Sequence, residues 1–335
     1  MKKFAFCAAA LAILCLMSAC SEKEGVYSPK KKIAKVYQAS TNIYGFHEEV
    51  SGEWFYDTNS SPKTLAEDWT WDGNKLSKIT FYETGSVVSK GEVSDMFTFT
   101  YDGKQVTRIE GYDQYMTISY DGSKLKQVQI FDKEDNDLDG TLEFVHDGKK
   151  ITKINVTIND EDLVKSPSAM NLQKVLFRGI LPTIDQADRV VAAMDKVVKS
   201  NDTKAQTTIP MELTWTGDNV TGISMNPMGP MGMTMNGTYV FDNKNNPYQN
   251  FLFGIIGTME DGSMIIFNKN NVTKAVMKTQ MSFMGQTFTE TQEANYNYTY
   301  DGNWPITRTM KSVYTDEEDE RYSSETEGVT YFEYK

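Results

Sequence analysis

The segment Tyr101-Asp102-Gly103-Lys104-Gln105-Val106-Thr107-Arg108-Ile109 decides the fold of this chain, because its pattern recurs along the sequence. Eight copies of the pattern, some of them degenerate, begin at Trp71, Tyr101, Tyr120, His146, Trp215, Phe241, Phe267 and Tyr300. An Asp-Gly pair that follows an aromatic residue is typical of a β-hairpin turn, since glycine adopts a positive φ and aspartate bonds to its own backbone. We therefore expect each copy to form a strand, a turn and a second strand.

Alternation of side chains on both sides of the turns supports this interpretation. Phe97, Phe99 and Tyr101 fall on one face of a strand, with threonines on the other. A loop from Asp102 to Val106 then places Thr107 and Ile109 on the face of the aromatic residues. This pattern predicts antiparallel strands with one apolar face and one face in water.

The number of copies predicts the architecture. Eight hairpins in series give a meander of about sixteen strands, because sequential strands usually pair as neighbours. Further strands are expected near residues 33–37 and 329–334. Sheets of this size curl or close. We predict a single all-β domain over residues 33–335, a large antiparallel up-and-down barrel with strands of about five to seven residues.

A helical pattern interrupts the meander and predicts a helical insertion over residues 163–203. Apolar residues from Ile184 to Val198 recur at helical spacing after a capping box at Thr183 and Gln186. A shorter helix is expected from Pro167 to Arg178. A barrel of roughly sixteen strands is too wide for side chains alone to fill. The helices around 167–200 are therefore expected to plug the barrel or pack on its inner face, the alternative being a helical hairpin outside one edge.

The N-terminus has the three parts of a bacterial export signal. Two lysines precede an apolar run over residues 4–17 and then Ser18-Ala19-Cys20. The run is shorter than the roughly 20 residues of a transmembrane helix, so residues 1–19 are expected to be removed. Residues 16–20 resemble a lipobox, which implies lipidation of Cys20 and a lipidated tether over residues 20–32. An ordinary secretory signal is the alternative.

Composition excludes several classes of function. The 335 residues include 46 acidic and 34 basic side chains, a net charge of −12, so nucleic acid is a poor partner and anionic surfaces repel the chain on average. The three cysteines (Cys7, Cys15 and Cys20) all lie near the N-terminus, and there are two histidines. Since no nucleophile elbow, phosphate loop or spaced metal-ligand motif is present, we expect no enzyme activity and no resident cofactor.

Repeated Tyr-Asp-Gly turns after a lipobox resemble a Bacteroidetes lipoprotein family of unknown function with a described porin-like fold, and more distantly the YD repeats of Rhs proteins. The resemblance covers about residues 65–335. Ser21-Glu22-Lys23-Glu24 is similar to the signal that sends such lipoproteins to the outer leaflet of the outer membrane. The resemblance implies a surface-exposed outer-membrane lipoprotein and no active site. Because the expected strands are shorter than the 9 to 11 residues of membrane strands, we expect a water-soluble barrel held by its lipid.

One segment is a candidate calcium site. Asp135, Asp137 and Asp139 stand in a D-x-D-x-D-G sequence, the first half of a calcium loop. The twelfth position of the loop is His146 in place of the bidentate glutamate. A solvated acidic hairpin loop is the alternative interpretation.

Clusters of methionine and aromatic residues have two interpretations each. Met225, Met228, Met231, Met233 and Met235 resemble copper(I) clusters, but their alternation favours a packed core. Trp54, Tyr56 and Trp304 lie near turns, where they would stack on sugar rings or cap the barrel ends. Residues 251–267 are apolar on both strand faces, so either the helices or a partner protein is expected to cover them.

These observations favour a lipid-anchored, non-catalytic binding or adhesion protein of the cell envelope, with a glycan or an envelope protein as its partner. A structural or accessory component of an outer-membrane assembly, contacted through residues 251–267, is the alternative. A polysaccharide hydrolase is the third hypothesis, since a catalytic carboxylate pair is formed in three dimensions and leaves no sequence motif.

Overall fold

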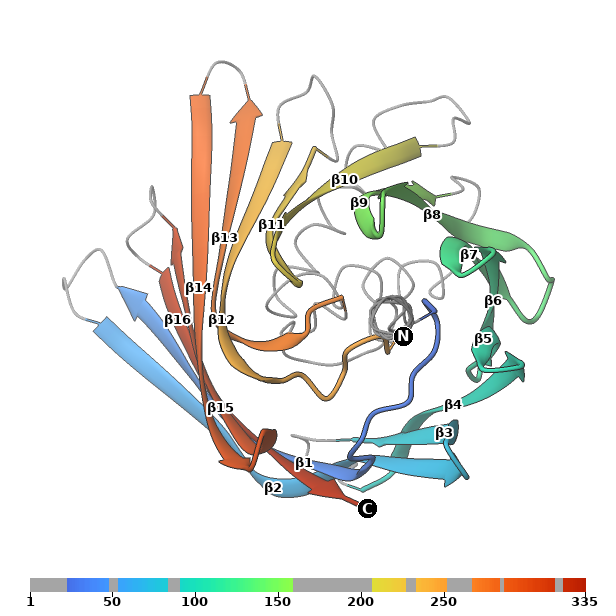
Figure 1. Cartoon of the computed structure of the whole chain (residues 1–335). Coiled ribbons are helices and arrows are strands. Elements are labelled where there is room, and N and C mark those ends of the chain that lie inside the picture. The colour runs from blue at the N-terminus through green and yellow to red at the C-terminus, as the bar shows by residue number, and fades with distance from the viewer. Residues whose placement is uncertain are drawn as a thin grey trace, which may run out of the picture.

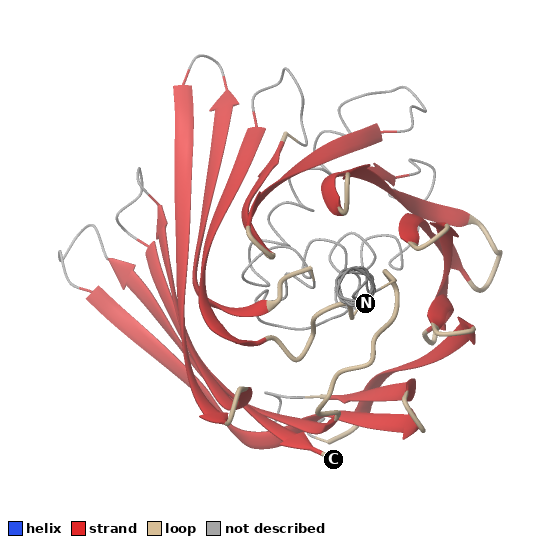
Figure 2. Cartoon of the chain, in the orientation of Figure 1, coloured by secondary structure: helices blue, strands red, loops and turns tan. Residues whose placement is uncertain are grey.

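The computed structural model describes residues 23–47, 54–83, 91–158, 207–226, 233–251, 267–283, 286–316 and 322–335. They form a closed barrel of sixteen antiparallel strands, each paired with its neighbours in sequence (Figures 1 and 2). The all-β up-and-down barrel predicted from the sequence is therefore confirmed. The predicted signal peptide, Cys20 and the predicted helices lie outside the described residues. Within those residues, no helix has the length and apolar character needed to cross a bilayer.

The strands are β1 (Ile33–His47), β2 (Trp54–Asp72), β3 (Lys75–Tyr82), β4 (Val93–Asp102), β5 (Gln105–Glu110), β6 (Gln114–Asp121), β7 (Lys124–Asp132), β8 (Leu138–Asp147), β9 (Lys150–Ile158), β10 (Thr207–Thr216), β11 (Asn219–Met225), β12 (Met233–Asn245), β13 (Asn270–Phe283), β14 (Gln286–Asp301), β15 (Trp304–Asp316) and β16 (Tyr322–Tyr334). β1 pairs with β16 from Ile33 and Tyr334 to Phe46 and Tyr322, which closes the sheet. The strands expected near residues 33–37 and 329–334 are thus the closing pair. Closure leaves no edge strand free to pair with another molecule.

The strand lengths differ from the prediction. They range from 6 residues in β5 to 19 in β2, and the strands of one side, β12 to β16 with β1 and β2, are the long ones (Figure 1). The expectation of five to seven residues was wrong because the outer parts of these strands are rich in Ser, Thr and Asn and lack apolar alternation. They pair nevertheless: Thr41 faces Ser60, and their hydroxyl oxygens are 3.1 Å apart.

Six of the eight sequence copies are two-residue hairpin turns. In the copy quoted first, Asp102 pairs with Gln105, so Gly103 and Lys104 alone form the turn, and the expected longer loop to Val106 is wrong. Only the first central residue has a positive φ, which is the type II′ arrangement. The glycines that adopt it are Gly73, Gly103, Gly122, Gly148, Gly217 and Gly302, with φ values between 55° and 63°.

A β-bulge follows each turn and explains the conserved spacing within the repeat. Tyr101 pairs with Val106 while Thr100 pairs with Arg108, so Thr107 is the extra residue of the bulge. Val106, and not Thr107 as expected, therefore lies inward with Ile109. The Thr107 hydroxyl donates to the Thr100 carbonyl oxygen at 3.4 Å. The same bond across the turn joins Ser77 to Thr70, Thr152 to Val145, and Thr221 to Thr214.

In four of the six hairpins, those that begin at Trp71, Tyr101, Tyr120 and Trp215, the aromatic residue of the repeat donates a hydrogen bond to a backbone carbonyl of the strand before it. The Tyr101 hydroxyl donates to the Leu76 carbonyl oxygen at 2.8 Å, and the Tyr120 hydroxyl to that of Val106 at 2.6 Å. The Trp215 indole nitrogen donates to the Ile151 carbonyl oxygen at 2.7 Å. A single motif therefore specifies the turn, the bulge and the contact between neighbouring hairpins.

The copies at Phe241 and Phe267 do not form hairpins of their own. β12 continues through Asp242 to Asn245, which pairs with Asn270 at the start of β13. No glycine follows Asp242, so no positive φ is available there, and its carboxylate instead accepts bonds from the backbone nitrogens of Lys244 and Asn271. The copies at Phe241 and Phe267 therefore contribute one strand each, β12 and β13, instead of two. The barrel still has sixteen strands because β1 and β16, which belong to no copy of the repeat, complete it.

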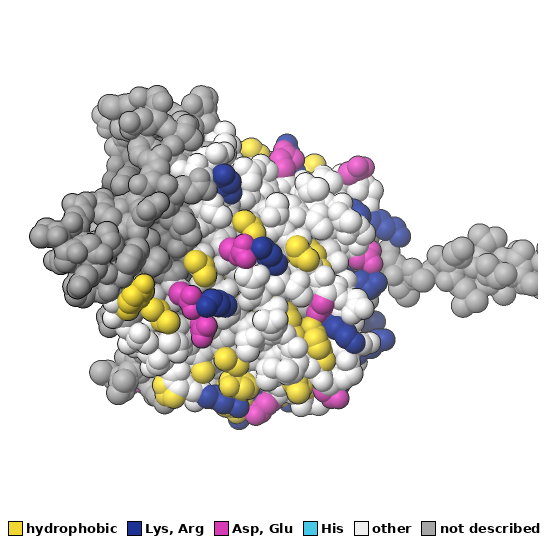
Figure 3. Space-filling view, turned by 90° about the vertical axis from the view of Figure 1, so that its left-hand side faces the viewer, with side chains coloured by type: hydrophobic (Ala, Val, Ile, Leu, Met, Phe, Trp, Pro, Cys, Tyr) yellow, Lys and Arg dark blue, Asp and Glu magenta, His cyan; other side chains and the backbone are white. Residues whose placement is uncertain are grey.

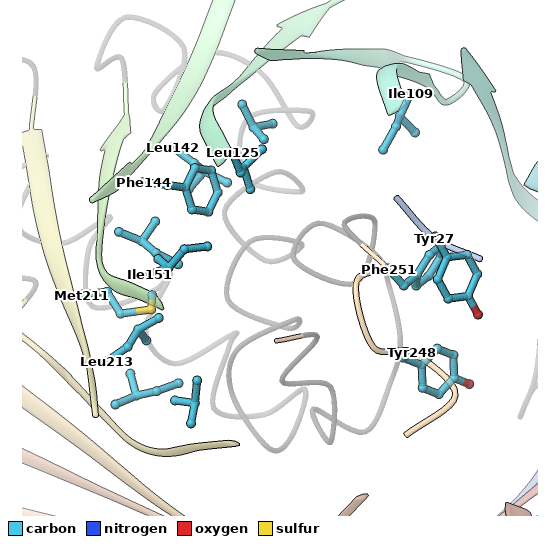
Figure 4. Close-up of a cluster of buried hydrophobic side chains, with 14 of the residues drawn as sticks. Tyr27, Ile109, Leu125, Leu142, Phe144, Ile151, Met211, Leu213, Tyr248 and Phe251 are labelled. Carbon is cyan, nitrogen blue, oxygen red and sulfur yellow. The ribbon is translucent and has the colours of Figure 1, made fainter. Parts of the chain in front are cut away.

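The inward face of β3 to β11 is an apolar wall. Figure 4 shows Leu125, Leu142, Phe144, Ile151 and Met211 along it, and all of them are buried. Met225 and Met235 belong to the same buried core, as the alternation predicted. Met228 and Met231 lie outside the described residues, as does the side chain of Met233. The interior of this side is therefore the main hydrophobic core.

Candidate functional site

The two ends of the barrel carry different connections. The six hairpin turns lie at one end, the turn end, together with residues 246–251 after β12 and residues 267–269 before β13. The strand ends joined by the other connections, such as the end of β1 and the start of β2, lie at the opposite end, the loop end. This follows from the up-and-down order of the strands, since successive connections alternate between the ends.

The structure does not bring the three candidate sugar-stacking residues together. Trp54 and Tyr56 begin β2 at the loop end, whereas Trp304 begins β15 at the turn end. Along a strand as long as β2, the ends are on the order of 50 Å apart. Tyr56 is 65% exposed, and the Trp54 side chain lies outside the described residues. The Trp304 ring packs edge-on against Tyr334 at 6.2 Å, so it caps the barrel end.

The candidate calcium ligands also diverge. Asp135 and Asp137 are exposed, and Asp135 accepts a bond from the Asp137 backbone nitrogen at 3.0 Å. Asp139 is 4% exposed and accepts a bond from the Gln114 amide at 2.9 Å. In the part of the chain that the structure describes, no three His, Cys, Asp or Glu side chains are grouped to hold a metal ion. This arrangement favours the acidic loop, which was the alternative interpretation, and calcium binding stays a prediction.

The described part of the expected tether, residues 23–32, is packed across the turn end, and we call it the N-terminal strap. The Glu24 backbone nitrogen donates to the Ser123 carbonyl, and Gly25 accepts a bond from the Val106 nitrogen at 3.1 Å. The Glu24 carboxylate lies 3.0 Å from the His146 ring nitrogen. At its other end, Lys32 accepts a bond from the Lys335 backbone nitrogen at 2.9 Å. The strap therefore spans the mouth between distant hairpins.

Aromatic rings fill the turn end beneath the strap. Tyr27 packs against Trp69, Trp71 and Phe251, with ring centroids 4.9 to 6.1 Å apart. Tyr248 joins the group next to Trp69 and Phe251, with ring centroids 6.2 Å from each. We call these five residues the aromatic plug. Figure 4 shows Tyr27, Tyr248 and Phe251 side by side. Tyr27 and Trp69 thus cover Phe251, a role that the sequence had suggested for the helices or a partner; residues 252–266 lie outside the described part.

A buried pair of opposite charges borders the aromatic plug, and sequence reasoning missed it. Glu67 on β2 and Arg308 on β15 are 3% and 4% exposed. The Glu67 carboxylate accepts a bond of 2.6 Å from the Trp69 indole, and an Arg308 guanidinium nitrogen donates to the Thr330 hydroxyl at 2.9 Å. Burial lowers the pKa of Arg308 to about 10, against the opposing effects of Tyr248 and Glu67. The arginine therefore stays charged at neutral pH.

Polar side chains continue from this pair along the inward face of the long strands. Gln292 on β14 donates to the Ser312 hydroxyl at 3.1 Å, and both residues are buried. Residues that pair across neighbouring strands lie on the same face of the sheet. The strand pairing therefore identifies the inward residues of β1, β2 and β16 that continue this polar surface. We call this surface the polar wall: Gln38, Ser40, Asn42, Thr64, Glu67, Gln292, Arg308, Ser312, Thr326 and Thr330. The part nearer the loop end, from Ser40 to Asn42, is half-buried.

The polar wall left a signal in the sequence. Glu67 lies on the same strand face as Trp69 and Trp71, and Arg308 lies on the same face as Met310. Each therefore places a charge at an inward position. Burying polar groups costs free energy unless they are hydrogen-bonded, so such positions are informative. A search for charged residues at strand positions that the alternation assigns to the apolar, inward face would have found Glu67 and Arg308.

Asp95 bears on the hydrolase hypothesis. Burial raises the pKa of the Asp95 carboxyl, against the bonds donated by the backbone nitrogens of Met96 and Tyr112, and Asp113 raises it further. Asp113 itself is exposed. A glycosidase needs two carboxyls that flank the substrate, and of these two residues only Asp95 is partly buried. The hydrolase hypothesis stays a prediction.

Comparisons with known proteins add little. No family model matches the chain, and no curated protein matches it significantly. Among solved structures, a chain of the TcdB2-TccC3-TEV crystal structure matches 82% of this chain at 9% identity, with a TM-score of 0.18. This chain spans about a fifth of that one, 21% of its length. A double mutant of the Rh. blastica porin matches 89% of this chain and 99% of its own, at 10% identity and a TM-score of 0.20. At these scores neither similarity supports an argument about function.

Proposed function

We propose that this protein is a lipid-anchored, non-catalytic binding protein of the outer membrane, and that its barrel takes a polar ligand along the polar wall. The observation that carries the proposal is a contrast inside the barrel: β3 to β11 face inward with mainly apolar side chains, whereas β1, β2 and β14 to β16 add the hydroxyl, amide and charged groups of the polar wall to their inward apolar residues. Ligand sites combine apolar surface with a few converging polar groups. Hydroxyls and amides suit a hydroxyl-rich ligand, so a glycan is the favoured class.

The outer face of the barrel supports a position outside the lipid phase. A membrane barrel needs an outward apolar band about 25 Å tall. Here the outward face carries ion pairs in the middle of the long strands, between Lys274 and Glu293 at 2.7 Å and between Lys311 and two glutamates, Glu325 and Glu327. The long strands, such as β2 with 19 residues, exceed the 9 to 11 residues of membrane strands, so strand length does not exclude a membrane barrel. The ion pairs on the outward face are instead the reason to place the barrel outside the lipid phase. The lipid on Cys20 is then the membrane anchor.

The accessory-component alternative depends on residues 251–267. Phe251 is 1% exposed and lies within the aromatic plug, so it offers no surface to a partner. The burial of Phe251 and the resemblance to surface lipoproteins of the Bacteroidetes both favour the binding hypothesis.

Binding to an array of bacterial and host glycans tests the proposal, followed by calorimetric titration of each glycan that binds. Asn42→Leu removes an amide from the accessible part of the polar wall, and Asn297→Leu makes the same change on the outward face of β14. We expect Asn42→Leu to weaken binding at least about tenfold, since losing hydrogen bonds in a site costs roughly 1.4 kcal/mol or more. Asn297→Leu should leave it unchanged. Absence of any glycan binding, or equal loss in both variants, would contradict the proposal.

A further inference from the structure

The turn end has a charge opposite to that of the whole chain. The chain carries a net charge of −12. The N-terminal strap alone contains four lysines, at positions 23, 30, 31 and 32, and one acidic residue, Glu24. Figure 3 shows basic side chains gathered along one rim of the barrel. The acidic excess therefore lies elsewhere on the molecule.

The six hairpin turns are close to neutral, with five lysines and six aspartates, so they leave the positive excess of the strap in place. The first four, at residues 72–75, 102–105, 121–124 and 147–150, contain five lysines and four aspartates. The other two contain an aspartate and no lysine, but each aspartate is paired: Asp218 with Lys269 at 3.0 Å, and Asp301 with Lys31 of the strap. Lys30, Lys104 and Lys149 are exposed and project from different parts of the rim. We call these three the rim lysines.

The same end holds the start of the described chain in a fixed place. Glu24 and Gly25 are bonded to hairpins of the barrel, so Lys23 cannot move far from the turn end. Cys20 is three residues earlier, a reach of about 10 Å even when the chain is extended. A lipid on Cys20 would therefore hold the turn end against the bilayer and point the loop end away.

From charge and connectivity together, we infer that the turn end is a membrane-docking face that binds anionic lipid headgroups through the rim lysines. This orientation rests on the lipid anchor of the proposed function, whereas the affinity for anionic lipid does not. Lysines close to an anionic surface strengthen binding roughly fivefold each. Acidic residues further along the barrel contribute little repulsion, because the Debye length at 0.1 M salt is about 10 Å.

The test uses the chain from Ser21 onward, which holds every described contact but has neither the signal nor Cys20. Its sedimentation with phosphatidylcholine vesicles is compared with that on vesicles containing phosphatidylglycerol as well. We expect binding to the anionic vesicles only, and loss of that binding in roughly 1 M NaCl, where the Debye length is about 3 Å.

Two matched variants locate the binding face. Lys30→Gln with Lys104→Gln and Lys149→Gln should weaken binding to anionic vesicles on the order of 100-fold. Lys63→Gln with Lys278→Gln and Lys311→Gln makes the same charge change on the barrel wall and should have little effect. Equal loss in the two variants, or no preference for anionic vesicles, would overturn the inference. Acylation of Cys20, measured by mass spectrometry of the native protein, tests the anchor separately.

Discussion

The Tyr27 hydroxyl donates a hydrogen bond of 2.7 Å to the carbonyl oxygen of Pro247, 220 residues further along the chain. This bond joins the N-terminal strap to the connection between β12 and β13. Both segments enter the turn end of the barrel, where the Tyr27 ring packs on Phe251 at 4.9 Å. The turn end is thus closed by two pieces of chain that meet at one tyrosine.

Truncating this tyrosine should loosen the barrel. Tyr27→Ala removes the ring contacts as well as the bond, so the free energy of unfolding should fall by about 3 to 5 kcal/mol. Tyr27→Phe removes only the bond and should cost about 1 kcal/mol. Denaturant titration measures both, with Tyr112→Ala, at a 53% exposed position, as the neutral control. Equal losses in Tyr27→Ala and Tyr112→Ala would show that the strap does not contribute to stability.

The buried charges Glu67 and Arg308 should behave as a coupled unit. Arg308→Met leaves Glu67 buried without its opposite charge and should cost about 3 to 5 kcal/mol of unfolding free energy. Adding Glu67→Gln should recover part of this loss, giving a coupling energy of about 1 to 3 kcal/mol in a double-mutant cycle. The exposed pair of Lys274 and Glu293 should give less than about 1 kcal/mol in the same cycle. Additive effects at Glu67 and Arg308 would mean that the two charges do not interact.

Buried tyrosines should make the barrel sensitive to alkali. Burial raises the pKa of Tyr101 from 10.0 to about 12, and that of the fully buried Tyr239 further. Because the folded pKa lies above the unfolded one, the stabilisation is fully present below pH 10 and is lost as the pH rises toward 12. The free energy of unfolding, measured from pH 10 to pH 12, should fall. The phenolate absorbance of the folded protein should rise at a higher pH than that of the unfolded chain. Ionisation of every tyrosine near pH 10 in the folded protein would contradict the burial.

Calcium should leave the stability unchanged. Asp139 is buried and bonded to Gln114, whereas Asp135 and Asp137 are exposed, and no metal-holding group of His, Cys, Asp or Glu side chains is found in the described part of the chain. The melting temperature in millimolar calcium should equal that in chelator. A calcium-dependent rise that Asp135→Asn abolishes would restore the calcium site.

The hairpin architecture could be predicted because it is local. Asp102 and Gly103 determine their turn without help from the rest of the chain, and the alternation around Phe99 identifies the buried face. The long strands were missed because pairs such as Thr41 with Ser60 gain their stability from the neighbouring strand, which a sequence pattern does not display. The copy at Asp242 forms no hairpin turn because no glycine follows the aspartate, and this difference could have been read from the sequence.

The candidate site was less predictable than the fold. Sugar stacking at Trp54 and Trp304 was proposed from residue type, but the order of the strands places these residues at opposite ends. The pairing of Glu67 with Arg308 arises only when the barrel closes, because β2 and β15 become near neighbours through β1 and β16. Contacts that depend on closure are invisible to local analysis.

The bond from Tyr101 to Leu76 recurs in three other hairpins, so each of these four is a module that contacts the preceding strand in the same way. A gene duplication that inserts one more module would add two strands and a new copy of the same joint, without requiring any new contact to evolve. The girth of such a barrel can therefore change during evolution in steps of one hairpin, while its ends keep their separate identities.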